Sequence, residues 1–189
     1  AVHPALAYTK VKQDDEVYYI SQGVVERLKG EYQVLGAVKG EDLVGLTYSG
    51  PFDELEAQQG VPHKVYPWDV VGEEEGTGVV HVAPGCGAED YDLAQRNGFP
   101  AVAPLDEDGM FVDGFGSFSG KSVHDVAPMV FESLEEKGYL YKLEDYTHRY
   151  PKCWRCKEEL VFRLVDEWFI SCDEIRPKMI EAARTIRWM

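Results

Sequence analysis

The sequence predicts a mixed α+β domain with a compact, β-barrel-like core of short strands and helices at its periphery. Three observations carry this prediction. Short β-favouring runs outnumber the helical patterns, and the turns between them are short. Hydrophobic residues make up 44% and charged residues 28% of the chain, as in globular proteins. A chain of 189 residues is also long enough to bury one core.

Strands joined by turns are expected in the N-terminal third. Residues 8–12 and 17–20 are β-favouring runs separated by the acidic turn QDDE, and residues 32–38 form a third run. Residues 23–28 favour a helical turn. Residues 46–63 are rich in Gly, Pro and polar groups, and this composition predicts a long irregular connection.

The sharpest local pattern lies in the middle of the chain. Residues 79–84 (VVHVAP) predict a buried strand, and residues 85–87 (GCG) predict a tight bend. A helix is expected over residues 88–96, with Glu89 and Asp90 in its first turn, where acids interact favourably with the helix dipole.

The remaining elements follow from the same signals. The motif DEDG at 106–109 predicts a hairpin turn, and apolar periodicity predicts helices over 123–137 and 173–187. Further β segments are expected at 63–71, 101–104, 139–146, 160–165 and 168–170.

The charge of the chain argues against a free-standing nucleic-acid-binding protein. The formal net charge is −15, whereas phosphate binding requires clustered Lys and Arg. One segment is basic and contains Arg149, Lys152, Arg155 and Lys157. This segment is either a solvated loop or a minor contact to RNA, in which case other parts of a larger molecule supply most of the attraction.

The composition favours a cytoplasmic protein that does not enter a membrane. No apolar run approaches the roughly 20 residues needed to span a bilayer, and the first ten residues do not resemble a secretory signal. The four cysteines are too few for a disulfide scaffold; they are Cys86, Cys153, Cys156 and Cys172.

One segment combines several groups that can act in catalysis. Residues 76–94 (GTGVVHVAPGCGAEDYDLA) are expected to bring together His81, the backbone amides of 85–87 and Asp90. Amides at a helix start can hold an oxyanion, an aspartate can hold an ammonium group, and a histidine can transfer protons. The structural alternative is a hydrogen-bonded strand histidine and a helix-start acid.

The motif CWRC at 153–156 has the spacing of half a tetrahedral zinc site. No second C-x-x-C follows, and His148 is a weak third candidate. A redox centre is disfavoured because no thioredoxin-like βαβ pattern surrounds the motif. Half a zinc knuckle with partner cysteines elsewhere is the preferred interpretation.

Several motifs together resemble the editing domain of isoleucyl-tRNA synthetases. They are GTGVVHVAPGCGAEDY (76–91), NGFP (97–100), PLDEDGMF (104–111), YTHRYPKCWRCKEELVFR (146–163) and EWFIS (167–171). The resemblance covers most of the chain from about residue 70. It implies the fold that valyl, isoleucyl and leucyl enzymes share in this domain.

The resemblance implies hydrolysis of the ester that joins misattached valine to tRNA(Ile). These enzymes are the standard example of a second selection step, because one methylene gives limited discrimination on binding. No cofactor is implied for editing. ATP is bound elsewhere in the whole enzyme, since the nucleotide-binding signatures of the family are absent from this sequence. The implied partners are the acceptor end of tRNA(Ile) and the rest of the synthetase chain, and the implied state is monomeric.

Residue roles also follow from the resemblance. Asp90 matches the essential aspartate that holds the α-ammonium group of the substrate, and His81 matches a histidine that shapes the amino-acid pocket. The expected substrate-binding set is His81, Thr77, Gly78, Val79, Val80, Gly85 and Gly87. The group that activates water is not identified.

The resemblance further implies two parts of the chain. Residues 1–147 would form the editing domain, and residues 148–189 an exit segment with half a zinc knuckle and a helix that leads back to the synthetase body. Cys153 and Cys156 would bind zinc in the full-length enzyme together with an upstream cysteine pair. A threonine-rich pocket segment is expected before Ala1, so weak or no hydrolysis is expected of the isolated chain.

Two other functions remain open at this stage. The chain is alternatively a non-catalytic module that binds the tRNA acceptor end, or a structural zinc domain. Loss of hydrolysis on changing Asp90 would separate editing from binding, and stoichiometric zinc in the isolated chain would favour the structural domain.

Overall fold

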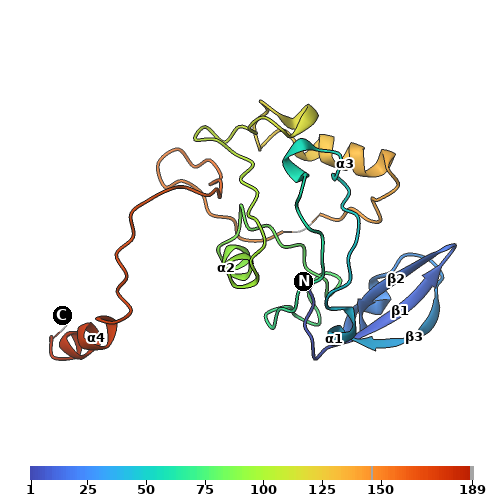
Figure 1. The fold of residues 1–189 in the computed structure, drawn as a ribbon, viewed down its shortest axis with the longest axis horizontal. Helices are drawn as coiled ribbons and strands as arrows, with labels where there is room; N and C mark the ends of the chain where they lie inside the picture. The colour runs from blue at the N-terminus through green and yellow to red at the C-terminus, as the bar shows by residue number, and fades with distance from the viewer. Residues whose placement is uncertain (146, 188–189) are drawn as a thin grey trace.

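A small antiparallel sheet forms the N-terminal end of the molecule in the computed structural model, which describes residues 1–145 and 147–187 (Figure 1). The sheet contains β1 (Ala7–Gln13), β2 (Glu16–Ser21) and β3 (Gln33–Lys39) in the order β2-β1-β3. In the register, Tyr8 pairs with Ser21 on one side and with Val38 on the other. The three predicted strands are confirmed, and the predicted helical turn is the 3₁₀ helix η1 (Gln22–Arg27).

Short helices, separated by irregular segments, follow along the rest of the chain. They are α1 (Gly40–Leu43), η2 (Glu56–Gln58), α2 (Ala88–Asn97), η3 (Gly116–Phe118), α3 (Ala127–Glu136) and α4 (Arg176–Arg184). The helix predicted over 88–96 is confirmed as α2, which ends at Gly98 with a left-handed φ of 69°.

Two helices are shorter than predicted at their N-terminal ends. The helix expected from residue 123 begins at Ala127, and the helix expected from residue 173 begins at Arg176. A proline lies in the first turn of each. Proline suits this position because the first helical N–H groups have no partner within the helix, so it marks the start more closely than apolar periodicity does.

Most of the strands predicted beyond the sheet do not form. Residues 80–83, 101–104, 139–145 and 160–170 have no regular structure, and Tyr146 lies outside the described residues. An isolated bridge between Lys152 and Glu159 precedes the last of these segments. Residues 63–71 contribute isolated bridges at Lys64 and Pro67. The prolines along these segments lack the N–H that a ladder needs, which favours single bridges; they are Pro62, Pro67, Pro84, Pro100 and Pro104.

The mixed α and β class is therefore confirmed, whereas the barrel-like core is not. The three-stranded sheet is open, and the described residues outside it contribute only isolated bridges. The hairpin predicted at 106–109 is present as a tight turn: the Asp106 N–H donates to the Met110 carbonyl at 3.0 Å, and Leu105 bridges Phe111.

Two small apolar clusters replace a single central core. Val2, Tyr8 and Leu43 form one at the end of the sheet, and Phe115, Phe118 and Val126 form the other between the loops and α3. Tyr8 is fully buried. Its hydroxyl donates to the Gly78 carbonyl at 2.7 Å and accepts the His3 N–H at 3.1 Å, so it joins the sheet to the segment that precedes residue 79.

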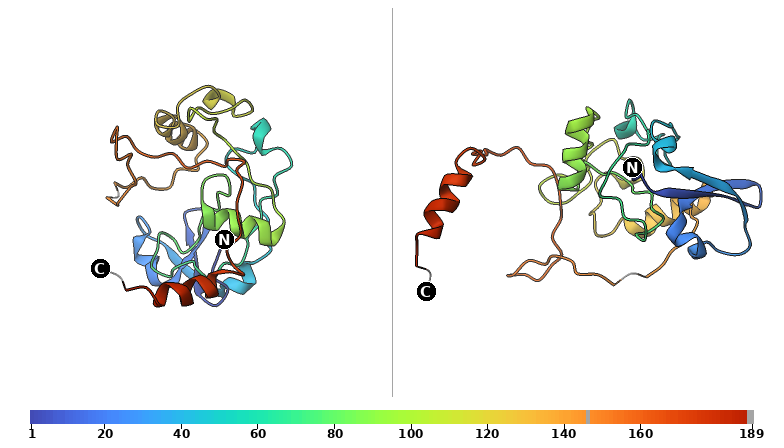
Figure 2. Two further views of the ribbon diagram at one scale, coloured as in Figure 1. Left: turned by 90° about the vertical axis from the view of Figure 1, so that its left-hand side faces the viewer. Right: turned by 90° about the horizontal axis from the view of Figure 1, so that it is seen from below.

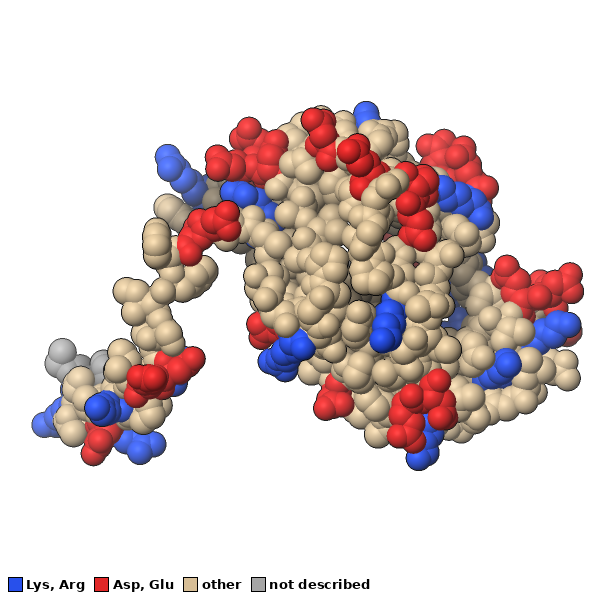
Figure 3. All heavy atoms as spheres, viewed as in Figure 1, with Lys and Arg blue, Asp and Glu red and all other residues tan. Residues whose placement is uncertain are grey.

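The C-terminal part of the chain leaves the body as an extended arm that carries α4 (Figures 1 and 2). Trp168 on this arm is 101% exposed, and the neighbouring Phe169 and Ile170 are 83% and 89% exposed. Among the described residues, no helix has the length and apolar character required to cross a membrane. Charged side chains lie mainly around the rim of the face shown in Figure 3, and acidic groups form most of the clusters at its edge.

Candidate functional site

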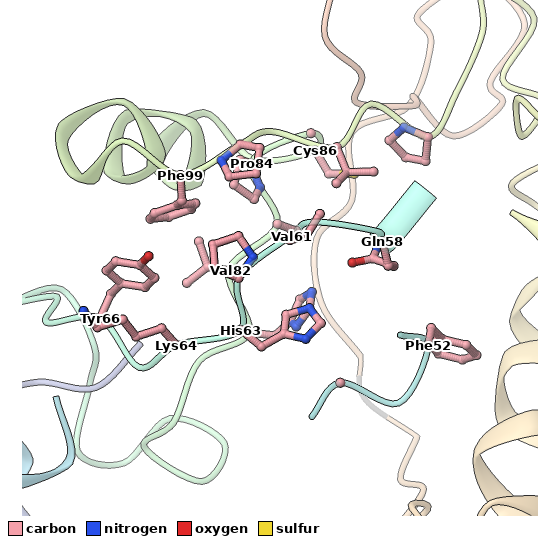
Figure 4. A pocket seen from close by; sticks show the side chains of 18 of the residues that line it. Phe52, Gln58, Val61, His63, Lys64, Tyr66, Val82, Pro84, Cys86 and Phe99 are labelled. Atoms are coloured by element: carbon pink, nitrogen blue, oxygen red, sulfur yellow. The ribbon is translucent and has the colours of Figure 1, made fainter. Parts of the chain in front are cut away.

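A pocket of about 320 Å³ lies between residues 48–66 and the segments on either side of α2 (Figure 4). Residues 48–66 form one wall and residues 81–104 form the other, with contributions from Ala1 and Phe115. The volume is at the lower end of the range for small-molecule sites. The lining is mainly aromatic and aliphatic, and two histidines, His63 and His81, supply its imidazoles.

The second wall is a bend whose shape depends on Asp90. The N–H groups of Cys86 and Gly87 donate to the Ala83 carbonyl at 2.9 and 3.1 Å. Asp90, in the first turn of α2, accepts the Ala83 N–H through Oδ1 at 2.9 Å and so closes the bend. Its other oxygen, Oδ2, has no hydrogen-bond donor among the described residues.

Both glycines of this bend are required by close approaches. A Cβ atom at position 85 would lie 1.8 Å from the Val102 carbonyl oxygen, and one at position 87 would lie 2.0 Å from Asp90 Oδ2. Because the first neighbour is backbone, Gly85 permits the two chain segments to meet at the pocket. Gly85 lines the pocket, whereas Gly87 supports the carboxylate behind it.

The charge of Asp90 acts on groups in the pocket wall. Burial raises the pKa of the Cys86 thiol, and the Asp90 carboxylate raises it further. Burial lowers the pKa of the Ala1 ammonium group, and Asp90 opposes that shift. Both groups line the pocket. Asp90 itself does not line the pocket, but its carboxylate interacts with two groups that do.

His81 lies on the pocket wall but in an irregular segment, and the buried strand expected around it is absent. The residue is exposed, and its imidazole makes no hydrogen bond or ion pair with the described residues. Its position fits the predicted role of shaping the pocket, a role that remains a prediction.

The residues before His81 contact the sheet instead of the pocket. The Ser21 N–H donates to the Thr77 carbonyl at 2.8 Å, the Val80 N–H donates to the Ala1 carbonyl at 2.9 Å, and Val79 bridges Val2. Gly78 has a φ of 72°, and a Cβ there would lie 2.3 Å from the Ser21 Cβ.

None of these four residues, Thr77, Gly78, Val79 and Val80, lines the pocket. Their predicted contact with substrate remains a prediction. The contacts that the structure gives them connect the bend to the sheet.

The first wall was not predicted from the sequence. It contains Tyr48, Phe52, His63 and Tyr66, which lie in or next to the segment expected to be an irregular connection. Tyr66 packs on Phe99 of the opposite wall with ring centroids 4.5 Å apart. A signal was available, because long irregular loops in compact domains are often functional.

The C-x-x-C motif forms a turn far from α2 along the chain. The Cys153 N–H donates to the Glu158 carbonyl at 2.8 Å, and Lys157 has a φ of 67°. The backbone N–H of Cys156, followed by that of Arg155, lowers the pKa of the Cys153 thiol. The turn thus favours a thiolate and fits half a zinc knuckle. Within the described ranges, no group of three or more His, Cys, Asp or Glu side chains could hold a metal ion.

The basic side chains around this motif are exposed. Lys152 lies 3.7 Å from Glu159, and the Lys157 ammonium donates to the Trp154 carbonyl. They do not line the pocket of His63 and His81.

Comparison with known proteins gives a consistent set of relatives, although no protein-family model matches the chain. The isoleucine–tRNA ligase of Methanothermobacter thermautotrophicus is 37% identical over 100% of the chain, and that of Pyrococcus furiosus is 38% identical over 96%. The isoleucine–tRNA ligase of Thermotoga neapolitana is 36% identical over 100% of the chain. The chain spans about a fifth of the length of these relatives, 18%, 18% and 21% respectively. The chain is thus a homologue of one segment of the isoleucine–tRNA ligases.

Proposed function

We propose that this chain is an editing domain that hydrolyses the ester of valine misattached to tRNA(Ile). The observation that carries the proposal is the bend at 83–87, closed by Asp90, which forms a wall of the pocket in a chain homologous to isoleucine–tRNA ligases along its whole length. Residues 81–86, within the motif that suggested editing, line this wall.

The pocket suits selection by size. Its volume of about 320 Å³ is sufficient for a small aliphatic side chain and part of a nucleoside. Forcing an additional methylene into a closely packed site typically costs about 1–3 kcal/mol. A pocket that accepts valine can therefore exclude isoleucine. This preference is opposite to that of a synthetic site, which binds isoleucine more tightly than valine.

Asp90 supplies the charge that orients the substrate. Oδ1 is engaged with the Ala83 N–H, so Oδ2 is the oxygen available to an α-ammonium group. A charge-assisted hydrogen bond at this point would fix the position of the ester carbonyl relative to the wall. His81 would limit the length of the bound side chain.

The proposal includes the two-part organisation inferred from the resemblance. Residues 1–147 would carry out editing, and residues 148–189 would lead back to the body of a larger cytoplasmic, monomeric ligase of protein synthesis. ATP-dependent joining of isoleucine to tRNA would take place in that body. Cys153 and Cys156 would hold zinc with cysteines supplied from outside residues 1–189.

A chimeric enzyme tests the proposal. The chain replaces the matching segment of the Thermotoga neapolitana isoleucine–tRNA ligase, and release of valine and of isoleucine from charged tRNA(Ile) is measured. We expect selective release of valine, and a loss of about 10²-fold on Asp90→Ala because the ester is no longer held in place. Asp92→Ala is the matched control, since Asp92 lies on the same helix and, among the described residues, its carboxylate pairs only with Arg96, at 3.7 Å.

Isoleucine charging by the chimera reports that the ligase body is intact. A chimera that charges isoleucine normally but releases valine no faster than one with a Gly-Ser linker in place of the chain would refute editing. Valine release that survives Asp90→Ala unchanged would refute the role of the aspartate. Tight binding of the charged tRNA without release would support the non-catalytic module instead.

A further inference from the structure

The wall opposite the bend carries a histidine held by an aspartate, which the role proposed for Asp90 does not use. His63 Nδ1 lies 2.8 Å from Asp53 Oδ1. The second oxygen of Asp53 accepts the Gly50 N–H at 2.9 Å, so both carboxylate oxygens are engaged. The His63 side chain is 20% exposed and lines the pocket.

The surroundings of His63 also restrict the position of its imidazole. The Tyr48 ring stacks on it at a centroid distance of 5.3 Å and an angle of 14°. The Tyr48 N–H donates to the His63 carbonyl at 3.2 Å. A Cβ at Gly50 would lie 2.5 Å from His63 Cε1, so the turn that carries Asp53 closes tightly around the ring.

The ion pair determines which ring nitrogen is available. Because a carboxylate accepts hydrogen bonds, Nδ1 carries the proton that is donated to Asp53. The neutral imidazole then has an unprotonated Nε2, and no hydrogen bond from the described residues reaches it. A histidine whose Nδ1–H is held by a carboxylate is the usual arrangement of a general base, because the carboxylate also stabilises the imidazolium that forms.

The two histidines of the pocket differ in this respect. His81 has no hydrogen-bonding partner among the described residues, whereas His63 is stacked, ion-paired and partly buried. Figure 4 shows His63 on the side of the pocket opposite Pro84 and Cys86, so a substrate held on the bend would face it. Orientation by a fixed partner favours His63 for proton transfer.

We propose that His63 is the general base of ester hydrolysis and that Asp53 positions it; this inference rests on the proposed editing function. Nε2 removes a proton from water while the water oxygen bonds to the ester carbonyl carbon. The bond from that carbon to the ribose oxygen then breaks, and the leaving ribose oxygen takes the proton back from Nε2. One water is consumed, and valine and uncharged tRNA are released.

The test uses the same chimera and measures valine release under single-turnover conditions over a range of enzyme concentrations. His63→Ala is expected to lower the rate constant at saturation by about 10²- to 10⁴-fold, the usual contribution of a general base. The concentration for half-saturation should change less than twofold. Asp53→Asn should lower the same rate constant, and the matched histidine control, His124→Gln, should change neither quantity.

Added imidazole gives a readout that a merely structural role would not move. It should raise the rate constant of valine release by His63→Ala at least tenfold and have no effect on that of Asp90→Ala. The inference is overturned if His63→Ala keeps more than half of the valine release. It is also overturned if His63→Ala charges isoleucine normally but imidazole fails to restore its valine release. Both outcomes leave editing itself intact, whereas a chimera without Asp90-dependent release overturns the editing proposal and this inference with it.

Discussion

Replacing Tyr8 with phenylalanine tests how the sheet holds the pocket-forming half of the chain. The side chain is fully buried, and its hydroxyl makes two hydrogen bonds, to the Gly78 carbonyl and from the His3 N–H. Phenylalanine keeps the ring but leaves these two backbone groups without that partner. A buried group left unpaired costs about 1–3 kcal/mol. Because the His3 group is only partly buried, we expect a total loss of about 2 kcal/mol.

Urea denaturation followed by circular dichroism measures this loss. For a chain of this size about 2 kcal/mol corresponds to a fall in Tm of roughly 4–8 °C. Tyr19→Phe is the matched control, because Tyr19 lies on the neighbouring strand, is 38% exposed, and has no hydrogen bond from its hydroxyl among the described residues. Equal stability of the two variants would refute the argument that Tyr8 connects the sheet to residues 77–80.

Three further predictions concern other parts of the molecule. Gly85→Ala should destabilise the chain by about 1–3 kcal/mol in urea denaturation, because the new Cβ would meet a backbone carbonyl. Gly72→Ala should cost less, because the Cβ there would meet only a flexible glutamate side chain. Equal losses of stability in the two variants would contradict the close approach at Gly85. The Asp90 charge raises the pKa of Cys86, so less thiolate is present near pH 8. Asp90→Asn should therefore speed alkylation of this cysteine by iodoacetamide near pH 8, measured by peptide mass spectrometry, and the difference should vanish at a pH high enough to ionise both thiols. A slower reaction in the variant would reverse the assigned sign. Trp168→Ala should leave the free energy of unfolding of the isolated chain within about 0.5 kcal/mol, because the side chain is fully exposed, and a larger loss would show that the arm packs on the body.

The elements predicted best from the sequence are those fixed by local signals. The alternating runs of the first forty residues became β1, β2 and β3 because each has a paired neighbour nearby in the chain. Helix α2 followed from its acidic first turn and its glycine end. These signals act within a few residues, so a sequence carries them directly.

The buried strand predicted at 79–84 shows where local reasoning was insufficient. Its apolar residues favour a strand, but only Val79 finds a bridge partner, Val2, and the segment then turns at Pro84. Whether an apolar run becomes a strand depends on a neighbour to pair with. That neighbour is set by the tertiary fold, which the run itself does not encode.

One wall of the pocket falls within the predicted motif. His81 and Gly85 line this wall and Asp90 closes the bend behind it, whereas their roles toward a substrate remain predictions. The opposite wall depends on Asp53 and His63, which are ten residues apart in a segment without regular periodicity. The bridge between Thr47 and Lys64 and the Gly50 N–H that holds Asp53 bring them together, and no spacing rule describes these contacts.

The walls of the pocket can change without a change in the sheet. Neither wall belongs to the sheet. The two walls meet where Tyr66 packs on Phe99, and the second wall closes on itself where Gly85 approaches Val102, so these irregular segments set the width of the pocket. Substitutions along those segments can widen or narrow the opening without altering strand pairing. Under the proposed editing function, such substitutions would change the size of the amino acid that the pocket accepts while the sheet stays the same.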